Sequence, residues 1–436
     1  MSGANPGLSY DNTPPYSAPL RFFLSAPLFG IAAGLVLLID DSALASRWTP
    51  GTLAAVHLVA TGVMLQVMLG ALMQILPVVA GASFTAPHRV ASVTHVLVTA
   101  GALGLSWGLW RGQPSATLGG AFLLGSGLTI FLAAALFALL RAPAPAGQGR
   151  TSRDLRFALS GLLVTASLGL LLAGVLATGT ALPFPLQDLV NLHAGWGWVG
   201  WGGVLLAAAS WVIVPMFHIT PAYPVPIVRN WAPAAFALLL IWSASVPLRN
   251  HAAPLATAAL LCALALTFAL ATLQVQSRTR RSTPDASFRA FRLAMFTIVA
   301  GTLAVALSLF TDWESAPLLA GALILHGGFV GAISSMLYKI VPFLSWLHLV
   351  QAGIKAPNVK KLSPDQPVRR QLNVHAAALA CLLAAILSPQ LAPLAGATLI
   401  IEFTWLLVNL TRVVSAWRRA GGQWRQGANK ENENCV

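Results

Sequence analysis

The chain has 436 residues, of which 57% are hydrophobic and only 9% are charged. Soluble domains carry about 25% charged residues, so this composition excludes a soluble globular protein and indicates an integral membrane protein surrounded by lipid. The formal net charge of +14 does not indicate nucleic-acid binding, because basic loops beside a bilayer act mainly as topology signals.

Twelve apolar stretches are long enough to cross a membrane, given that a spanning helix needs about 20 mainly apolar residues. We therefore predict an all-α integral membrane fold with a single transmembrane domain over residues 20–413. Residues 1–19 are predicted to be a disordered tail and residues 414–436 a second polar tail. The predicted helices are centred near residues 30, 65, 100, 128, 168, 202, 238, 265, 301, 330, 380 and 402.

Basic residues divide unequally between the loops on the two sides of the predicted bundle. Of the 26 Lys and Arg residues, 22 fall on one side, three (Arg47, Arg111 and Arg249) fall on the other, and Lys339 lies inside a helix. Positive loops mark the cytoplasmic face. The pattern predicts a multi-pass protein of a bacterial inner membrane with both termini in the cytoplasm.

Three of the predicted helices resemble one another. Each has one His near its start and an aliphatic residue followed by Pro near its end, the histidines being His57, His193 and His326. Their spacings of 136 and 133 residues indicate a triplicated chain. We predict a pseudo-threefold array of four-helix repeats, at about 20–140, 157–276 and 291–413.

A His inside a membrane helix is costly unless it faces a partner or a cavity. Three at equivalent positions predict a shared ligand-binding role in the outer third of the bilayer, although packing inherited through the repeats is an alternative. Imidazole ligates haem iron and copper. Glycines in the same helices allow either close packing or a flat slot for a porphyrin.

Other polar residues give weaker signals. His88, His218 and His348 follow the three prolines and are expected near the inner surface, while His251 and His375 are expected at solvated helix ends. Glu402 is predicted to be buried in the last helix, and Lys339 to extend toward the inner surface. The three cysteines form no CxxC motif, so neither covalent haem attachment nor a cysteine zinc site is supported.

The stretch His193-Ala-Gly-Trp-Gly-Trp-Val-Gly-Trp and its ending at Pro215 resemble a haem-ligating helix of the catalytic subunit of cbb-type haem–copper oxidases. The ending Met336-Leu-Tyr-Lys-Ile-Val-Pro342 is similar to related helices of that family. The resemblance implies twelve helices in pseudo-threefold array, with His ligands on the second, sixth and tenth. It extends to the related nitric-oxide-response haem–copper proteins (NnrS-like).

The chain departs from the oxidase pattern at several positions. Helix ten offers His326 without a second His, Asn191 stands two residues before His193, and the seventh helix (about 231–248) lacks a His-His pair. The basic pair that holds haem propionates is missing after helix eleven, so Arg47, Arg111 or Arg249 would have to substitute. A complete haem–copper oxygen reductase is therefore not expected.

The resemblance implies a b-type haem with His57 and His326 as first-choice axial ligands and His193 as a third ligand. Pairing of His57 with His193 is the alternative, and copper is a second candidate metal. The expected function is electron transfer or nitric oxide and redox handling without oxygen reduction, with an electron donor or other membrane subunits as partners. A copper or metabolite transporter and a cofactor-less assembly or structural subunit remain as alternatives, so enzymatic activity stays open.

Overall fold

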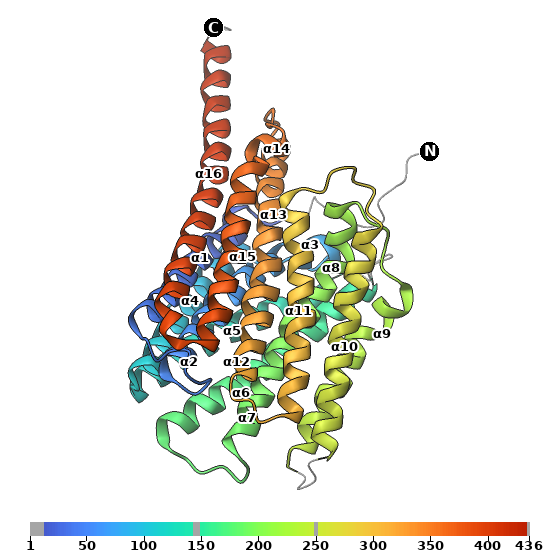
Figure 1. Cartoon of the computed structure of the whole chain (residues 1–436). Coiled ribbons are helices and arrows are strands. Elements are labelled where there is room, and N and C mark those ends of the chain that lie inside the picture. The colour runs from blue at the N-terminus through green and yellow to red at the C-terminus, as the bar shows by residue number, and fades with distance from the viewer. Residues whose placement is uncertain (1–12, 143–148, 248–251, 434–436) are drawn as a thin grey trace.

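The computed structural model describes residues 13–142, 149–247 and 252–433, and side chains as far as Gly421. Within these ranges the chain is helical and contains no β-strand. The 1–12 part of the predicted N-terminal tail lies outside the described residues. The structure confirms an all-α fold with helices suited to a membrane (Figure 1).

Twelve helices in the described part of the chain are long and apolar enough to cross a membrane, as predicted. Three of them contain a π-helical segment and are called composite helices below: α2–η2–α3 (Pro50–Ala80), α7–η3–α8 (Leu186–His218) and α12–η4–α13 (Ala316–Gln351). The others are α1 (Ser17–Ile39), α4 (Pro87–Arg111), α5 (Pro114–Arg141), α6 (Gly149–Thr178), α9 (Val225–Ser245), α10 (Ala252–Ser277), α11 (Ala286–Phe310), α15 (Asp365–Leu387) and α16 (Ala392–Glu433). A short helix, α14 (Val359–Leu362), lies before α15.

Helix contacts recur every four spans. Each composite helix packs on the span before it: α3 on α1, α8 on α6, and α13 on α11. The neighbouring pairs α4–α5, α9–α10 and α15–α16 also recur, and so do α5–α6, α10–α11 and α16–α1. The last pair joins the end of the bundle to its beginning.

Each composite helix contains a π-helical segment, which the sequence did not predict. The segments are η2 (Leu58–Met64), η3 (Trp196–Gly203) and η4 (Ala322–Val330). His57 directly precedes η2, His193 lies three residues before η3, and His326 lies within η4. The segments meet at Gly202, where a Cβ atom would clash with Met64 of η2 and contact Phe329 of η4. Because π-helical turns are frequent at functional sites, the three histidines stand at a distinctive place in the fold.

Glycines in and around these helices serve close packing. A Cβ at Gly161 of α6 would overlap the backbone of Gly200 in η3, and one at Gly195 would overlap the ring of Trp242. The space that a Cβ atom would occupy is taken by Phe29 at Gly62 and by Ile298 at Gly328. Small residues let membrane helices approach closely. The packing interpretation therefore holds at these positions, and neighbouring side chains occupy the space of the expected porphyrin slot.

The twelfth span continues beyond the apolar zone. The candidate span covers Pro389–Gly421, where the described side chains end, and the backbone of α16 continues to Glu433 as a projecting helix (Figure 1). The sequence predicted a polar tail over residues 414–436, and the backbone there is helical as far as Glu433. An even number of spans places both ends of the bundle on one side.

A carboxylate joins three segments at the N-terminus of α11. Asp285 accepts a hydrogen bond from the backbone N–H of Phe288 and forms ion pairs with Arg281 and Lys339. The Lys339 side chain therefore reaches the N-terminal end of α11. This fits the prediction that it extends toward the membrane surface. Burial alone would raise the pKa of Asp285, but Lys339, the Phe288 N–H and Arg281 together hold it below its ordinary value.

We expect Asp285→Asn to lower the free energy of unfolding by about 2–3 kcal/mol at neutral pH, because it leaves the charge of Lys339 without its partner. A depressed pKa stabilises the fold above the unfolded-state value of about 3.9 and loses that effect as pH falls through the folded-state value. The difference between wild type and variant should therefore stay constant from about pH 8 to 5 and narrow below about pH 4.

Thermal unfolding in detergent at several pH values measures this difference. Asp312→Asn is the matched control, because Asp312 is exposed in the loop that follows α11. Equal stability of the Asp285 and Asp312 variants at neutral pH would contradict the expectation.

Candidate metal and cofactor sites

Two of the three predicted histidines lie side by side. The rings of His57 and His193 are nearly parallel, with an interplanar angle of 13° and centroids 6.5 Å apart. They come from the second and sixth spans. The structure thus places His193 beside His57, the arrangement required by the alternative pairing in the sequence analysis.

Both rings are oriented by main-chain carbonyls. His57 Nδ1 lies 2.7 Å from the carbonyl oxygen of Leu53, and His193 Nδ1 lies 3.1 Å from that of Thr165 on α6. A carbonyl oxygen only accepts, so Nδ1 carries the proton in each neutral ring and Nε2 carries the lone pair. Ligating histidines typically donate their second nitrogen to such a carbonyl.

A glycine and an arginine lie close to this pair. Both rings are half-buried, and Gly169 of α6 lets the His193 ring approach the helix, since a Cβ there would lie 3.0 Å from His193 Cε1. Arg47 donates from Nη2 to Asn191 Oδ1 at 2.9 Å, two residues before His193. Burial lowers the pKa of Arg47. Of the three arginines predicted on the outer side, Arg47 is thus the one that contacts the helix of His193.

The other two outer arginines are placed differently. Arg111 lies over the rings of Trp107 and Trp110, at 5.7 and 5.9 Å from their centroids. Arg249 lies outside the described residues. Neither supplies a described contact with His57 or His193.

His326 belongs to a different cluster. Its Nε2 lies 3.2 Å from Glu402 Oε2, and His375 Nδ1 lies 2.7 Å from Glu402 Oε1. The exposed fractions are 4% for His326, 2% for His375 and 0% for Glu402. These residues come from the tenth, eleventh and twelfth spans, and among the described residues they form a group that could hold a metal ion.

The cluster has unsatisfied polar atoms. Nδ1 and Nε2 of His326 and Oε2 of Glu402 are buried without a hydrogen-bond partner, because the 3.2 Å contact lacks hydrogen-bond geometry. One ligand atom from each residue lies within 4.8 Å of the others. A buried unpaired polar group typically costs about 1–3 kcal/mol, so this arrangement calls for a proton or a cation.

The expectation that His375 is solvated at a helix end is wrong. Helix α15 begins at Asp365, so His375 lies well inside it and is buried against Glu402. The signal that could have found it is Glu402 itself, since a carboxylate in a membrane helix needs a cationic or hydrogen-bonding partner.

His218 is also more buried than expected. Its side chain is fully buried between Phe288 and Phe291, and Gln276 contacts its Nδ1 at 3.2 Å. Thr279 donates to the carbonyl of His218, so the loop after α10 covers this end of α8. His88, by contrast, is exposed, as expected near a surface.

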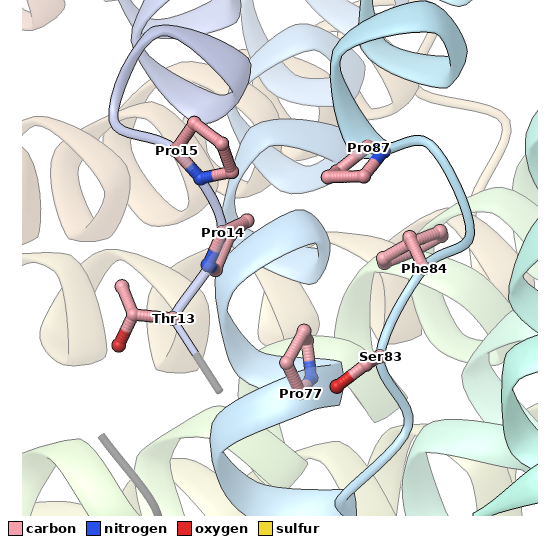
Figure 2. A pocket seen from close by; sticks show the side chains of 7 residues that line it. All are labelled: Thr13, Pro14, Pro15, Pro77, Ser83, Phe84 and Pro87. Carbon is pink, nitrogen blue, oxygen red and sulfur yellow. The ribbon is translucent and has the colours of Figure 1, made fainter. Parts of the chain in front are cut away.

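One hollow of about 200 Å³ lies between the start of α1 and the end of α3 (Figure 2). It is smaller than the roughly 300–1,000 Å³ of typical ligand pockets. Its lining has no titratable side chain and consists of Thr13, Pro14, Pro15, Pro77, Ser83, Phe84 and Pro87. It offers no ligand for a metal or haem.

Comparisons with known proteins return no match: no family model matches this chain, and no curated protein sequence matches it. The function must therefore be inferred from the two histidine clusters and from the helices that hold them.

Proposed function

We propose that this chain is a b-type haem-binding membrane protein that transfers electrons or handles nitric oxide and related redox chemistry, without reducing oxygen. The observation that carries the proposal is the His57–His193 pair. In this proposal His57 and His193 would hold the haem iron, and His326 would not.

The spacing of the two rings supports this assignment. A metal–nitrogen bond is about 2.0–2.1 Å long, so two imidazoles that ligate one ion from opposite sides bring their ring centres to roughly 6 Å. The observed centroids are 6.5 Å apart. No described residue forms a hydrogen bond to Nε2 of His57 or His193, so the nitrogens that would ligate are available.

Access also favours this pair. His57 and His193 are half-buried, whereas His326 and His375 are enclosed by the bundle. A group as large as a porphyrin can approach the first pair with less rearrangement of the core. Helix contacts that recur every four spans, and a π-helical segment in each composite helix, support the pseudo-threefold, oxidase-like arrangement.

The residues around the pair have separate roles in this proposal. Haem would supply the redox couple, and two imidazoles would make its iron six-coordinate and suited to electron transfer. Leu53 and Thr165 fix the tautomers through their carbonyls. Arg47 is positioned to neutralise a carboxylate such as a haem propionate.

The proposed function excludes oxygen reduction on chemical grounds. It requires a high-spin haem opposite a copper held by three histidines, and helix ten supplies only His326, which contacts Glu402 and His375. We propose a bacterial inner membrane with both termini in the cytoplasm, an orientation that the basic loops support. In this orientation the His pair would lie in the outer half of the membrane.

The proposal is tested by the absorption spectrum of the purified, detergent-solubilised protein, oxidised and then reduced with dithionite. We expect a Soret band that shifts on reduction, a low-spin α-band, and about one b-type haem per chain, as one axial pair implies. A monodisperse but colourless protein, produced with ample haem, would contradict the proposal.

A transporter is the second candidate, because the last three spans contain buried polar side chains. Beyond Glu402, Gln371 is buried beside it, and Asn409 donates to the hydroxyl of Tyr338. Ionisable groups inside a membrane commonly mark ion pathways. A protein that carries metal but no colour would favour this class.

A further inference from the structure

We infer that His326, His375 and Glu402 form a binding site for one divalent first-row transition-metal ion, separate from the His57–His193 pair. The site uses two residues to which the sequence gave no ligand role. It does not depend on whether the chain binds haem.

The donor geometry is close to that of a mononuclear site. Metal–ligand distances of about 2.0–2.2 Å place neighbouring ligand atoms roughly 3 Å apart. The carboxylate oxygens of Glu402 lie 3.2 Å from His326 Nε2 and 2.7 Å from His375 Nδ1. All three ligand atoms lie within 4.8 Å of one another, so modest side-chain rotations suffice to close the set.

Unpaired atoms indicate that a cation, and not hydrogen bonding alone, completes the cluster. A proton shared between His326 and Glu402 would be expected to give hydrogen-bond geometry, yet His326 Nε2 and Glu402 Oε2 lie 3.2 Å apart without it, and His326 Nδ1 has no hydrogen-bond partner. A metal ion would accept lone pairs from an imidazole nitrogen and this oxygen together. It would also compensate a carboxylate that is 0% exposed.

The ligand types restrict the metal. Two imidazoles and one carboxylate suit Zn²⁺, Fe²⁺ and related divalent ions, whereas soft copper(I) prefers thiolates and thioethers. Three protein ligands leave at least one coordination position for water or a small substrate. Among the described residues, this makes the cluster a candidate reactive centre.

The surrounding fold holds the ligands in place. Gly331 of α13 admits the His375 ring, since a Cβ there would lie 3.0 Å from Nε2. His375 also packs against the ring of His326, with centroids 4.7 Å apart, and Phe403 borders His326 at 6.3 Å. Ligands fixed in this way favour one ion geometry over another.

The test is metal analysis of the purified full-length protein, followed by titration of the metal-free protein with Co²⁺ and recording of its visible d–d bands. We expect about one tightly bound equivalent, with band intensity typical of low-coordinate nitrogen and oxygen ligation. His326→Ala and His375→Ala should each weaken Co²⁺ binding by more than the 10–100-fold that follows loss of a supporting partner.

Glu402→Gln keeps the size of the side chain and removes the anionic ligand, so it should also lose the bands while remaining folded. His348→Ala is the matched control, because His348 lies on the same helix as His326 and its nitrogens contact the carbonyls of Leu344 and Pro14. Monodisperse wild-type protein that binds no Co²⁺ would overturn the inference, as would unchanged binding in the His326 and His375 variants. His57→Ala and His193→Ala should retain the Co²⁺ bands, which separates this site from any haem.

Discussion

His193→Ala and His57→Ala are each expected to abolish the low-spin haem spectrum and to reduce haem content at least about tenfold. If the proposed haem is bound, each variant would remove one of the two imidazole nitrogens that hold its iron, and the remaining imidazole would hold it alone. Free imidazole added to either variant should restore part of the low-spin spectrum by occupying the vacated space. Absorption spectra and the ratio of haem to protein measure both effects.

Two further variants make this result decisive. His88→Ala removes an exposed His whose Nδ1 hydrogen-bonds to the Ser17 hydroxyl, and it should leave the spectrum unchanged. His326→Ala should also keep the Soret band if His57 pairs with His193. Loss of the band in His326→Ala, with retention in His193→Ala, would restore the first-choice pairing of His57 with His326 and contradict the assignment made here.

Gly161→Val is expected to prevent stable folding, with a loss that exceeds the 1–3 kcal/mol typical of an overpacked core. The added Cβ would meet the carbonyl of Gly200, and backbone cannot rotate away as a flexible side chain can. Helix α6 would have to move away from η3, which also breaks the contact between Thr165 and His193. The measurement is the monodisperse fraction and melting temperature of detergent-solubilised protein.

Gly174→Val is the control on the same helix, because apart from the adjoining backbone of α6 no atom lies within 4 Å of the position that its Cβ would occupy. It should express and melt like the wild type within a few degrees, since only a small helix-propensity cost applies. Equal behaviour of the two variants would show that α6 does not need close contact with η3.

The second and eleventh spans show how far local sequence signals reach. Hydropathy located the helix of His57 correctly, because burial in lipid requires a long apolar run whatever its neighbours are. The same reasoning began the eleventh helix too late. Its first turns carry Asp365, Arg369 and Arg370, which are polar although the backbone there is already helical. Because of this error, His375 was expected at the end of the helix, whereas it lies in the interior.

Sequence alone determined that the protein crosses a membrane with twelve helices, and that three of them carry His57, His193 and His326 at a regular period. Hydropathy and spacing are properties of the chain itself, so they can be read without coordinates. Tertiary structure decided which side chains meet: His57 with His193, and His326 with His375 and Glu402. These contacts depend on the rotation of each helix and on how closely its glycines let it approach a neighbouring helix. Neither property can be derived from the local sequence composition.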